Sequence, residues 1–279
     1  MKDYRVGIVG LGVVGKCVQR LFKDDVVAIY DPAIRASNKE SFKYVDIAII
    51  SVPTNEKENW EADTTVVWQS LEWLSKALNK NAIILIKSTV PPTEIEKMHK
   101  KYKHVVFSPE FSGESKYYTP PWKYPDPQNM ESHTWQVFGG DYEDTTMCVD
   151  IFKRRMGVDT QFWQTDIKTA SLAKYIENSF FAMKVTFVNE WYDIAKRYNV
   201  DWNELRELWL LDPRINRNHT LVFPRDRGYG GKCFPKDTRA IIYDVAKKGF
   251  KPQLMLTMDK VNWEYRHACP KDRDTKSSD

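Results

Sequence analysis

The stretch Gly10-Leu11-Gly12-Val13-Val14-Gly15 decides the fold, because it lies where a short apolar run ends and a helical pattern begins. Residues 4–9 predict a strand, and residues 13–22 predict a helix. In such a strand–turn–helix unit the first glycine permits a tight turn, the second lets the backbone approach a pyrophosphate, and the third allows close helix–strand packing. The helix N-terminus then faces the phosphates. The stretch therefore predicts a dinucleotide site on a Rossmann-type α/β fold.

An acidic residue then favours one dinucleotide. Residues 26–30 predict a second strand, and it ends at Asp31. A carboxylate there can accept hydrogen bonds from both hydroxyls of the adenosine ribose and would repel a 2′-phosphate, so the predicted cofactor is NAD rather than NADP. Arg35 lies close by and weakens this preference slightly. The alternative is a glycine-rich turn in a nucleotide-free α/β protein, which the strand, helix and acid together make the weaker hypothesis.

The rest of the first half repeats the alternation of strand and helix. Helices are predicted over residues 64–78 and 92–102, and strands over residues 45–52, 82–86, 104–107 and 134–138. Nearly continuous apolar strands separated by helices predict a parallel sheet covered on both faces. Residues 117–129, rich in Pro and Tyr, predict a loop over the mouth of a site.

The second half is helical. Residues 166–198 contain neither Gly nor Pro, and apolar residues recur there at intervals of three or four. These are Leu172, Ile176, Phe180, Met183, Phe187, Trp191 and Ile194. They predict one amphipathic helix of roughly 45–50 Å, the spine of a second domain or a dimer contact. Further helices are predicted over residues 203–211, 235–248 and 253–267, with a loop over residues 213–231 and a cap at Gly249.

This pattern predicts three segments. They are an NAD-binding Rossmann-type domain over residues 1–165, an α-helical substrate and dimerisation domain over residues 166–268, and a charged tail over residues 269–279. We expect no internal repeat.

Composition narrows the classes of protein. With 279 residues, 42% of them hydrophobic, the chain is long enough for a core without disulfides and is not disordered overall. No apolar run approaches the ~18 residues of a membrane helix, and no apolar leader opens the chain, so we expect a cytoplasmic protein without a membrane span. The net charge of +4 is spread out and predicts no nucleic-acid partner. The four cysteines are predicted to be reduced thiols, and the five histidines show no ligand spacing that would predict a metal site.

The second dense motif is Gly228-Tyr229-Gly230-Gly231-Lys232-Cys233-Phe234-Pro235-Lys236-Asp237. Pro235 fits the first turn of a helix, so Cys233 is predicted to lie just before a helix N-terminus, where the macrodipole favours a thiolate. Lys232 and Lys236 add positive potential, and Asp237 follows four residues after the thiol. A nucleophilic thiol with a nearby carboxylate suits covalent oxidation of an aldehyde. Judged by these residues alone, an inert loop cysteine is an equal alternative.

Taken together, the motifs resemble those of the UDP-glucose/GDP-mannose dehydrogenases, collinearly from Val6 to about Asn262. The matching pieces are Gly10 to Gly15, Val52-Pro53-Thr54, Lys87-Ser88-Thr89-Val90-Pro91, Ser108-Pro109-Glu110-Phe111, Ala173-Lys174 to Asn178, Phe187-Val188-Asn189-Glu190, Asp212-Pro213-Arg214-Ile215 and Gly230 to Asp237.

The resemblance implies oxidation of a sugar C6 alcohol to a carboxylate with two NAD per turnover. A first hydride transfer produces an aldehyde, and Cys233 adds to it as a thiolate. A second hydride transfer converts the thiohemiacetal to a thioester, which water hydrolyses.

The resemblance also assigns roles to residues. Lys174 and Asn178 would stabilise oxyanions on C6 together with Asp237, and Glu110 would be the acid/base for thioester hydrolysis. Thr89 would position the water, and Arg214 would reach a nucleotide sugar across a homodimer interface formed by the long helix. The implied cofactor contacts are Gly10, Gly12, Val13, Val14, Gly15, Asp31, Arg35, Pro53, Thr54 and Thr89. The implied substrate contacts are Glu110, Glu114, Lys174, Asn178, Arg214 and Gly230.

The chain departs from the family at its end. The family continues into a third, Rossmann-like domain, whereas this sequence stops soon after Asn262, so we expect these residues alone not to build the full nucleotide site. Three hypotheses remain: a compact active dehydrogenase, an enzyme that needs a partner chain, and a binding protein without turnover. Retention of Cys233 disfavours simple decay. The enzymatic alternative is a two-electron hydroxyacid dehydrogenase, which uses a lysine on the long helix and needs no thiol.

Overall fold

The computed structural model describes residues 4–34, 37–111 and 130–267. The described residues form two compact units, one with those up to Lys174 and the other with those from Tyr175 onward. The predicted loop over residues 117–129 and the charged tail over residues 269–279 lie outside the described residues.

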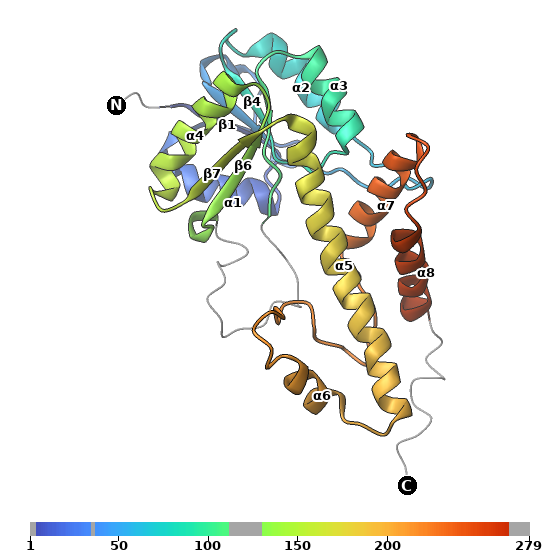
Figure 1. Ribbon diagram of the computed structural model, residues 1–279. Helices are drawn as coiled ribbons and strands as arrows, with labels where there is room; N and C mark the ends of the chain where they lie inside the picture. The colour runs from blue at the N-terminus through green and yellow to red at the C-terminus, as the bar shows by residue number, and fades with distance from the viewer. Residues whose placement is uncertain (1–3, 35–36, 112–129, 268–279) are drawn as a thin grey trace. The chain divides into compact units, whose positions relative to one another are not determined.

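The first unit is built on a seven-stranded sheet of described residues in the order β2-β1-β3-β4-β5-β6-β7 (Figure 1). The strands are β1 (Val6–Val9), β2 (Val26–Tyr30), β3 (Ile47–Ile50), β4 (Ile83–Ile86), β5 (Val105–Phe107), β6 (Trp135–Gly139) and β7 (Gln161–Thr165). Neighbours from β2 to β5 are parallel, β6 is antiparallel to β5, and β7 is parallel to β6.

Four α-helices and three short 3-10 helices complete the described part of this unit, apart from the first turns of α5. They are α1 (Val13–Phe22), α2 (Thr65–Ala77), α3 (Pro92–Lys101), α4 (Tyr142–Met156), η1 (Lys23–Asp25), η2 (Glu40–Tyr44) and η3 (Met130–Ser132). Strand residues alternate between two cores, as the pleat requires. Ile47 and Ile49 belong to the core that α1 and α4 cover, whereas Ala48 and Ile50 belong to the core that α2 and α3 cover. The prediction of an α/β sheet covered on both faces is confirmed (Figure 1).

The sheet is parallel, as predicted, except at one place. Phe107 of β5 pairs with Gly139 of β6 in antiparallel sense. A short strand pattern does not encode strand direction, because direction depends on the connection between strands. The sequence also failed to indicate β7 and α4. Trp163 of β7 is exposed, so this strand has no clear apolar alternation, whereas α4 does bury Cys148, Ile151 and Phe152 at helical spacing.

The second unit is helical. It contains most of α5 (Ile167–Arg197), together with α6 (Trp202–Trp209), α7 (Phe234–Ala246) and α8 (Gln253–His267). Asp201 caps α6 by accepting a hydrogen bond from the Glu204 amide, and Tyr229 and Met258 lie in a small core with residues of α5. Gly249 has a φ of +79° after α7, as expected of a cap. No helix among the described residues is both long and apolar enough to cross a bilayer.

Candidate active site

The glycine turn packs tightly against β1, β3 and α1. Gly10 has a φ of +90°, and a Cβ there would lie 2.5 Å from the carbonyl oxygen of Ser51. A Cβ on Gly15 would lie 2.1 Å from the carbonyl oxygen of Gly10. A Cβ on Gly12, in contrast, would meet no described atom within 4 Å. The turn is therefore tightly packed at Gly10 and Gly15 but open at Gly12, where the pyrophosphate of a dinucleotide would approach.

The N-terminus of α1 is available to an anion. Gly12 is its N-cap, no side chain caps it, and its first turn contains no acidic residue. Its first intrahelical bond runs from the Lys16 amide to the Gly12 carbonyl, so the amides before Lys16 point out of the helix. These amides and the positive end of the helix dipole suit a pyrophosphate.

Asp31 is positioned for a ribose. Its carboxylate accepts hydrogen bonds from the amides of Leu11, at 2.6 Å, and Ala33, at 2.9 Å. These two hydrogen bonds lower the pKa of Asp31 below its usual value. Because β1 lies between β2 and β3, the strand order reverses beside this turn, which is where open α/β sheets bind ligands. The residues present therefore fit NAD. Arg35 lies outside the described residues.

The segments that follow β3 and β4 are tied together at the same sheet edge. The Ser88 hydroxyl donates to the Val52 carbonyl, at 2.7 Å, and accepts from the Val52 amide, at 2.8 Å. The first segment continues into Pro53, which is exposed, and Thr54, which is buried. The second continues into Thr89, which is half-buried.

Glu110 follows β5 and is almost fully buried. One carboxylate oxygen forms a 3.1 Å ion pair with the ammonium of Lys87. The other accepts a hydrogen bond from the Phe111 amide, at 3.0 Å, and lies 4.0 Å from Nδ1 of His133.

Lys174 lies close to this group. It is 7% exposed, and its ammonium lies 4.7 Å from the centre of the Phe111 ring. One turn earlier in α5, the Ser171 hydroxyl donates to the Val90 carbonyl at 2.7 Å. In the first unit Phe111 therefore contacts Lys174 through its ring and Glu110 through its amide, and α5 is bonded to the segment that contains Thr89.

A second group surrounds the N-terminus of α7. Cys233 is the N-cap of this helix and is exposed. Asp237 is buried in the first turn, donates its amide to the Cys233 carbonyl, and accepts a 2.6 Å hydrogen bond from the Asn178 side chain. It also forms an ion pair with Lys236. The predicted position of Cys233 before a helix, with Asp237 one turn on, is confirmed.

The other described cysteines are buried. Cys17 is 5% exposed and Cys148 is fully buried, and burial raises the pKa of the Cys148 thiol. Of the three free cysteines in the described ranges, Cys233 is the one that solvent reaches.

The remaining predicted residues do not join either group. The Arg214 side chain is 86% exposed and is bound to Asp212 two residues earlier. Gly230 lies against the guanidinium of Arg266. Glu114 lies outside the described residues.

Sequence reasoning assigned no role to Lys87 or Phe111, although both lie within motifs that it used. One signal was present: Lys87 closes an apolar strand, Ile83–Ile86, where a buried lysine needs a partner. The partner itself was not apparent, because Glu110 lies on another strand.

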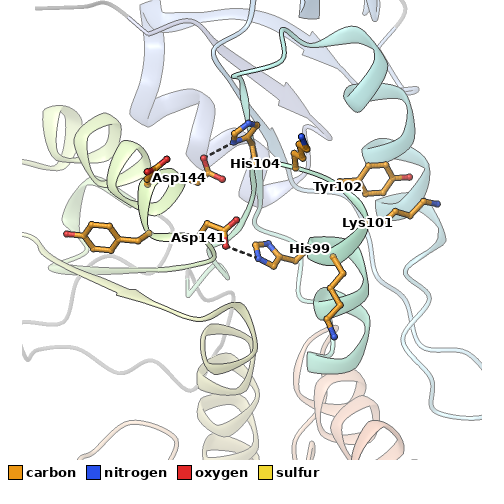
Figure 2. A pocket seen from close by; sticks show the side chains of 10 residues that line it. His99, Lys101, Tyr102, His104, Asp141 and Asp144 are labelled. Carbon is orange, nitrogen blue, oxygen red and sulfur yellow. Dashed lines mark hydrogen bonds and ion pairs between the residues drawn. The ribbon is translucent and has the colours of Figure 1, made fainter.

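A hollow of about 610 Å³ lies elsewhere, between the end of α3 and the first turn of α4 (Figure 2). His99 faces Asp141 at 3.4 Å, and His104 faces Asp144 at 2.9 Å. Since His104 immediately precedes β5 and Glu110 follows it, the hollow is at the opposite sheet edge from Glu110. The residues that the structure describes contain no group of three or more side chains suited to a metal ion.

Two sequence profiles of one family match this chain. The profile for the UDP-glucose/GDP-mannose dehydrogenase family, NAD binding domain, matches residues 26–119. The profile for the central domain of the same family matches residues 168–264, and the two matches cover more than half of the chain.

Individual relatives agree with the profiles. UDP-glucose 6-dehydrogenase of Rickettsia typhi is 33% identical over 206 residues, which is 72% of this chain and 45% of that protein. UDP-glucose 6-dehydrogenase TuaD of Bacillus subtilis is 29% identical over 273 residues, which is 94% of this chain and 54% of that protein. The chain spans about half the length of the curated relatives it matches.

Solved structures share the fold. A UDP-glucose dehydrogenase from Pyrobaculum islandicum superposes with a TM-score of 0.77 at 23% identity, covering 94% of this chain and 68% of that one. A 3-hydroxyisobutyrate dehydrogenase from Mycobacterium tuberculosis superposes with a TM-score of 0.71 at 16% identity, covering 95% and 94%. At these identities the likeness shows the fold alone.

Proposed function

Since this chain belongs to the UDP-glucose/GDP-mannose dehydrogenase family, we propose that it oxidises the primary alcohol of a nucleotide sugar to the uronate, with Cys233 as nucleophile. The observation that carries the proposal is the solvent-accessible thiol at the N-cap of α7, one turn from the buried Asp237. A helix N-terminus favours the thiolate form that adds to a carbonyl.

The chain's own residues hold the cofactor. Bound NAD supplies the hydride acceptor. The open space at Gly12 and the first amides of α1 bind the pyrophosphate, and the Asp31 carboxylate accepts hydrogen bonds from the ribose.

The remaining groups act on the sugar. The Cys233 thiolate adds to the aldehyde carbon, and the ammonium of Lys174 and the amide of Asn178 stabilise the negative charge on oxygen. Asp237 orients the Asn178 amide through their 2.6 Å hydrogen bond. Glu110 takes a proton from the water that hydrolyses the thioester, while Thr89 positions that water.

We also propose that the chain is a homodimer through α5. Leu172, Ile176, Phe180, Phe187 and Trp191 recur on one face of this helix and are each at least 43% exposed. An apolar face of this extent suits a self-complementary contact between two copies. In this arrangement the exposed Arg214 would reach the nucleotide sugar held by the partner.

Product stoichiometry tests the reaction. The full chain is incubated with NAD and a panel of UDP- and GDP-sugars, and NADH and uronate are both quantified. We expect two NADH per uronate. A ratio of one, with an oxidised product that is not a uronate, would contradict the four-electron route.

Cys233→Ser tests the covalent step. The hydroxyl is a poorer nucleophile and leaving group, so we expect uronate formation to stop at or before the acyl stage while NAD binding persists. Full uronate production by this variant would refute the nucleophilic role.

The competing function is two-electron oxidation of a hydroxyacid. The position of Lys174 at the start of α5 favours it, because such enzymes use a lysine on the long helix and no thiol. Alkylation of Cys233 separates the two, since a hydroxyacid dehydrogenase would keep its activity. NAD binding without turnover of any substrate would instead support the non-catalytic alternative.

A further inference from the structure

Lys87 is a fully buried lysine at the carboxyl edge of the parallel strands. It follows the apolar strand β4, and its side chain has no exposed surface. Lysine is almost never buried in this way without a partner, because removing an ammonium from water is costly. The Lys87 ammonium donates to the carbonyl and hydroxyl oxygens of Ser108, at 3.2 and 3.4 Å, and lies 5.7 Å from the centre of the Phe152 ring.

The charged partner of Lys87 is Glu110, at 3.1 Å. Ile86 and Phe107 are paired in the parallel register of β4 and β5, so Lys87 and Ser108 leave the sheet side by side. Glu110 follows two residues later and turns its carboxylate back to Lys87. The position of this carboxylate is therefore determined by two central strands rather than by a mobile surface contact.

The two Glu110 oxygens have different surroundings, because Oε2 is held by the charge of Lys87 without a hydrogen bond, whereas Oε1 accepts one. One meets Lys87, and the other accepts from the Phe111 amide and faces His133. The Phe111 ring in turn lies beneath the ammonium of Lys174. A chain of contacts therefore links Lys87, after β4, through Glu110 and Phe111 to Lys174 in α5.

Stability alone is a weak reason for this pair. A buried ion pair often contributes no more to stability than two packed apolar side chains, because both charges lose their hydration. Each end of the pair is nevertheless held in place, Lys87 by two hydrogen bonds to Ser108 and Glu110 by the hydrogen bond from the Phe111 amide. Positioning is the property that a buried pair supplies and an apolar pair does not.

We propose that Lys87 is a positioning residue that holds the Glu110 carboxylate in place as the base for thioester hydrolysis, an inference that rests on the proposed function. In this step the water oxygen bonds to the thioester carbon and its proton passes to Glu110. The carbon–sulfur bond breaks, and its electron pair remains on Cys233 as the thiolate. Lys87 touches no reacting atom and acts through Glu110.

Rapid-mixing kinetics on the full chain test this role with Lys87→Met and Glu110→Gln. Both hydride transfers precede hydrolysis. We therefore expect Lys87→Met to release a burst of two NADH per active site, followed by a steady-state rate at least tenfold below that of the wild type. The KM for the sugar should fall by a similar factor because the acyl-enzyme accumulates, while kcat/KM should change less than threefold. Intact mass spectrometry should show the acyl group on Cys233.

Rescue by hydroxylamine distinguishes a positioning role of Lys87 from a purely structural one, because it would not restore the activity of a variant that is only destabilised. Hydroxylamine cleaves thioesters without a general base, so it should restore NADH turnover in Lys87→Met and in Glu110→Gln. Phe138→Leu is the matched control, a buried substitution in the same unit outside the site. It should lower the melting temperature without a burst and without rescue.

A double variant covers the case in which Lys87→Met does not fold. Lys87→Met/Glu110→Gln leaves no unpaired buried charge, and its hydrolysis rate should equal that of Glu110→Gln. A further loss in the double variant would mean that Lys87 acts independently of Glu110 and would overturn the proposal.

The results distinguish a failure of the Lys87 role from a failure of the proposed function. If the wild type is active and Lys87→Met hydrolyses the thioester at the wild-type rate, the role of Lys87 alone is overturned. Normal hydrolysis in Glu110→Gln overturns the role of the pair, while the oxidation itself stands. A wild type that forms no NADH from any nucleotide sugar refutes the proposed function, and the Lys87 role falls with it.

Discussion

Gly12 and Gly15 are three residues apart in one turn, yet glycine is needed at the two positions for different reasons. A Cβ on Gly15 would press on the Gly10 carbonyl, whereas a Cβ on Gly12 would meet no described atom within 4 Å. Gly15→Ala should therefore destabilise the first unit by about 1–3 kcal/mol through overpacking. Gly12→Ala should fold normally, because its φ of −71° suits any residue, but should weaken NAD binding at least tenfold.

Urea unfolding and NAD titration check this pair of variants. Each serves as the control for the other, since they lie in the same turn. Tight NAD binding by Gly12→Ala would show that the pyrophosphate does not approach the chain there.

At the scale of the element, α5 presents the apolar face that we assign to a second copy. Phe180 is 50% exposed on this face. Phe180→Asp would place a charge in the contact twice, once from each copy, so we expect the dimer dissociation constant to rise roughly 100-fold or more. Sedimentation velocity across a concentration series measures this.

Lys196→Glu is the matched control for Phe180→Asp. Lys196 is exposed near the other end of α5 and projects from the opposite side of the helix. It should leave the oligomeric state unchanged. A wild type that is monomeric at all concentrations would contradict the α5 contact.

The loop between α6 and α7 contains a buried histidine that makes stability depend on pH. His219 is stacked on Phe181 with ring centres 4.2 Å apart. Burial, and secondarily the charge of Lys184, lower the pKa of His219 from 6.5 to about 4. Below pH 6.5 the unfolded chain takes up a proton that the folded chain refuses, so stability present above pH 6.5 is lost as pH falls toward 4. The loss should reach about 3 kcal/mol.

His219→Asn tests this linkage, because asparagine does not titrate and tolerates the φ of 62° at this position. Urea unfolding is measured for both proteins between pH 7 and pH 4.5. The variant should lose less stability across this range than the wild type does. Parallel pH profiles would show that His219 is not the source.

At the scale of the whole molecule, cofactor binding should stabilise the fold by mass action. NAD at 100 times its dissociation constant should add about 2.7 kcal/mol, which raises the melting temperature. NADP should raise it less, since its 2′-phosphate meets the ionised Asp31. Differential scanning fluorimetry measures both shifts.

Cys233→Ala is the control, because this residue lies outside the first unit and should leave both shifts intact. Equal shifts from NAD and NADP would contradict the discrimination assigned to Asp31.

Much of this protein was determined by its sequence alone. The helix over Val13–Phe22, the strand over Val26–Tyr30 and the helix over Gln253–His267 occur as predicted. Cys233 occupies the N-cap that Pro235 indicated. These features depend on side chains a few residues apart, so periodicity and capping residues encode them directly.

The tertiary structure alone decided which distant residues meet. Asn178 and Asp237 are bonded across 59 positions of the chain, Lys87 and Glu110 are paired from neighbouring strands, and β6 runs opposite to β5. Such pairings depend on strand order, register and helix packing, which arise only when the whole core is buried, and no local pattern specifies them.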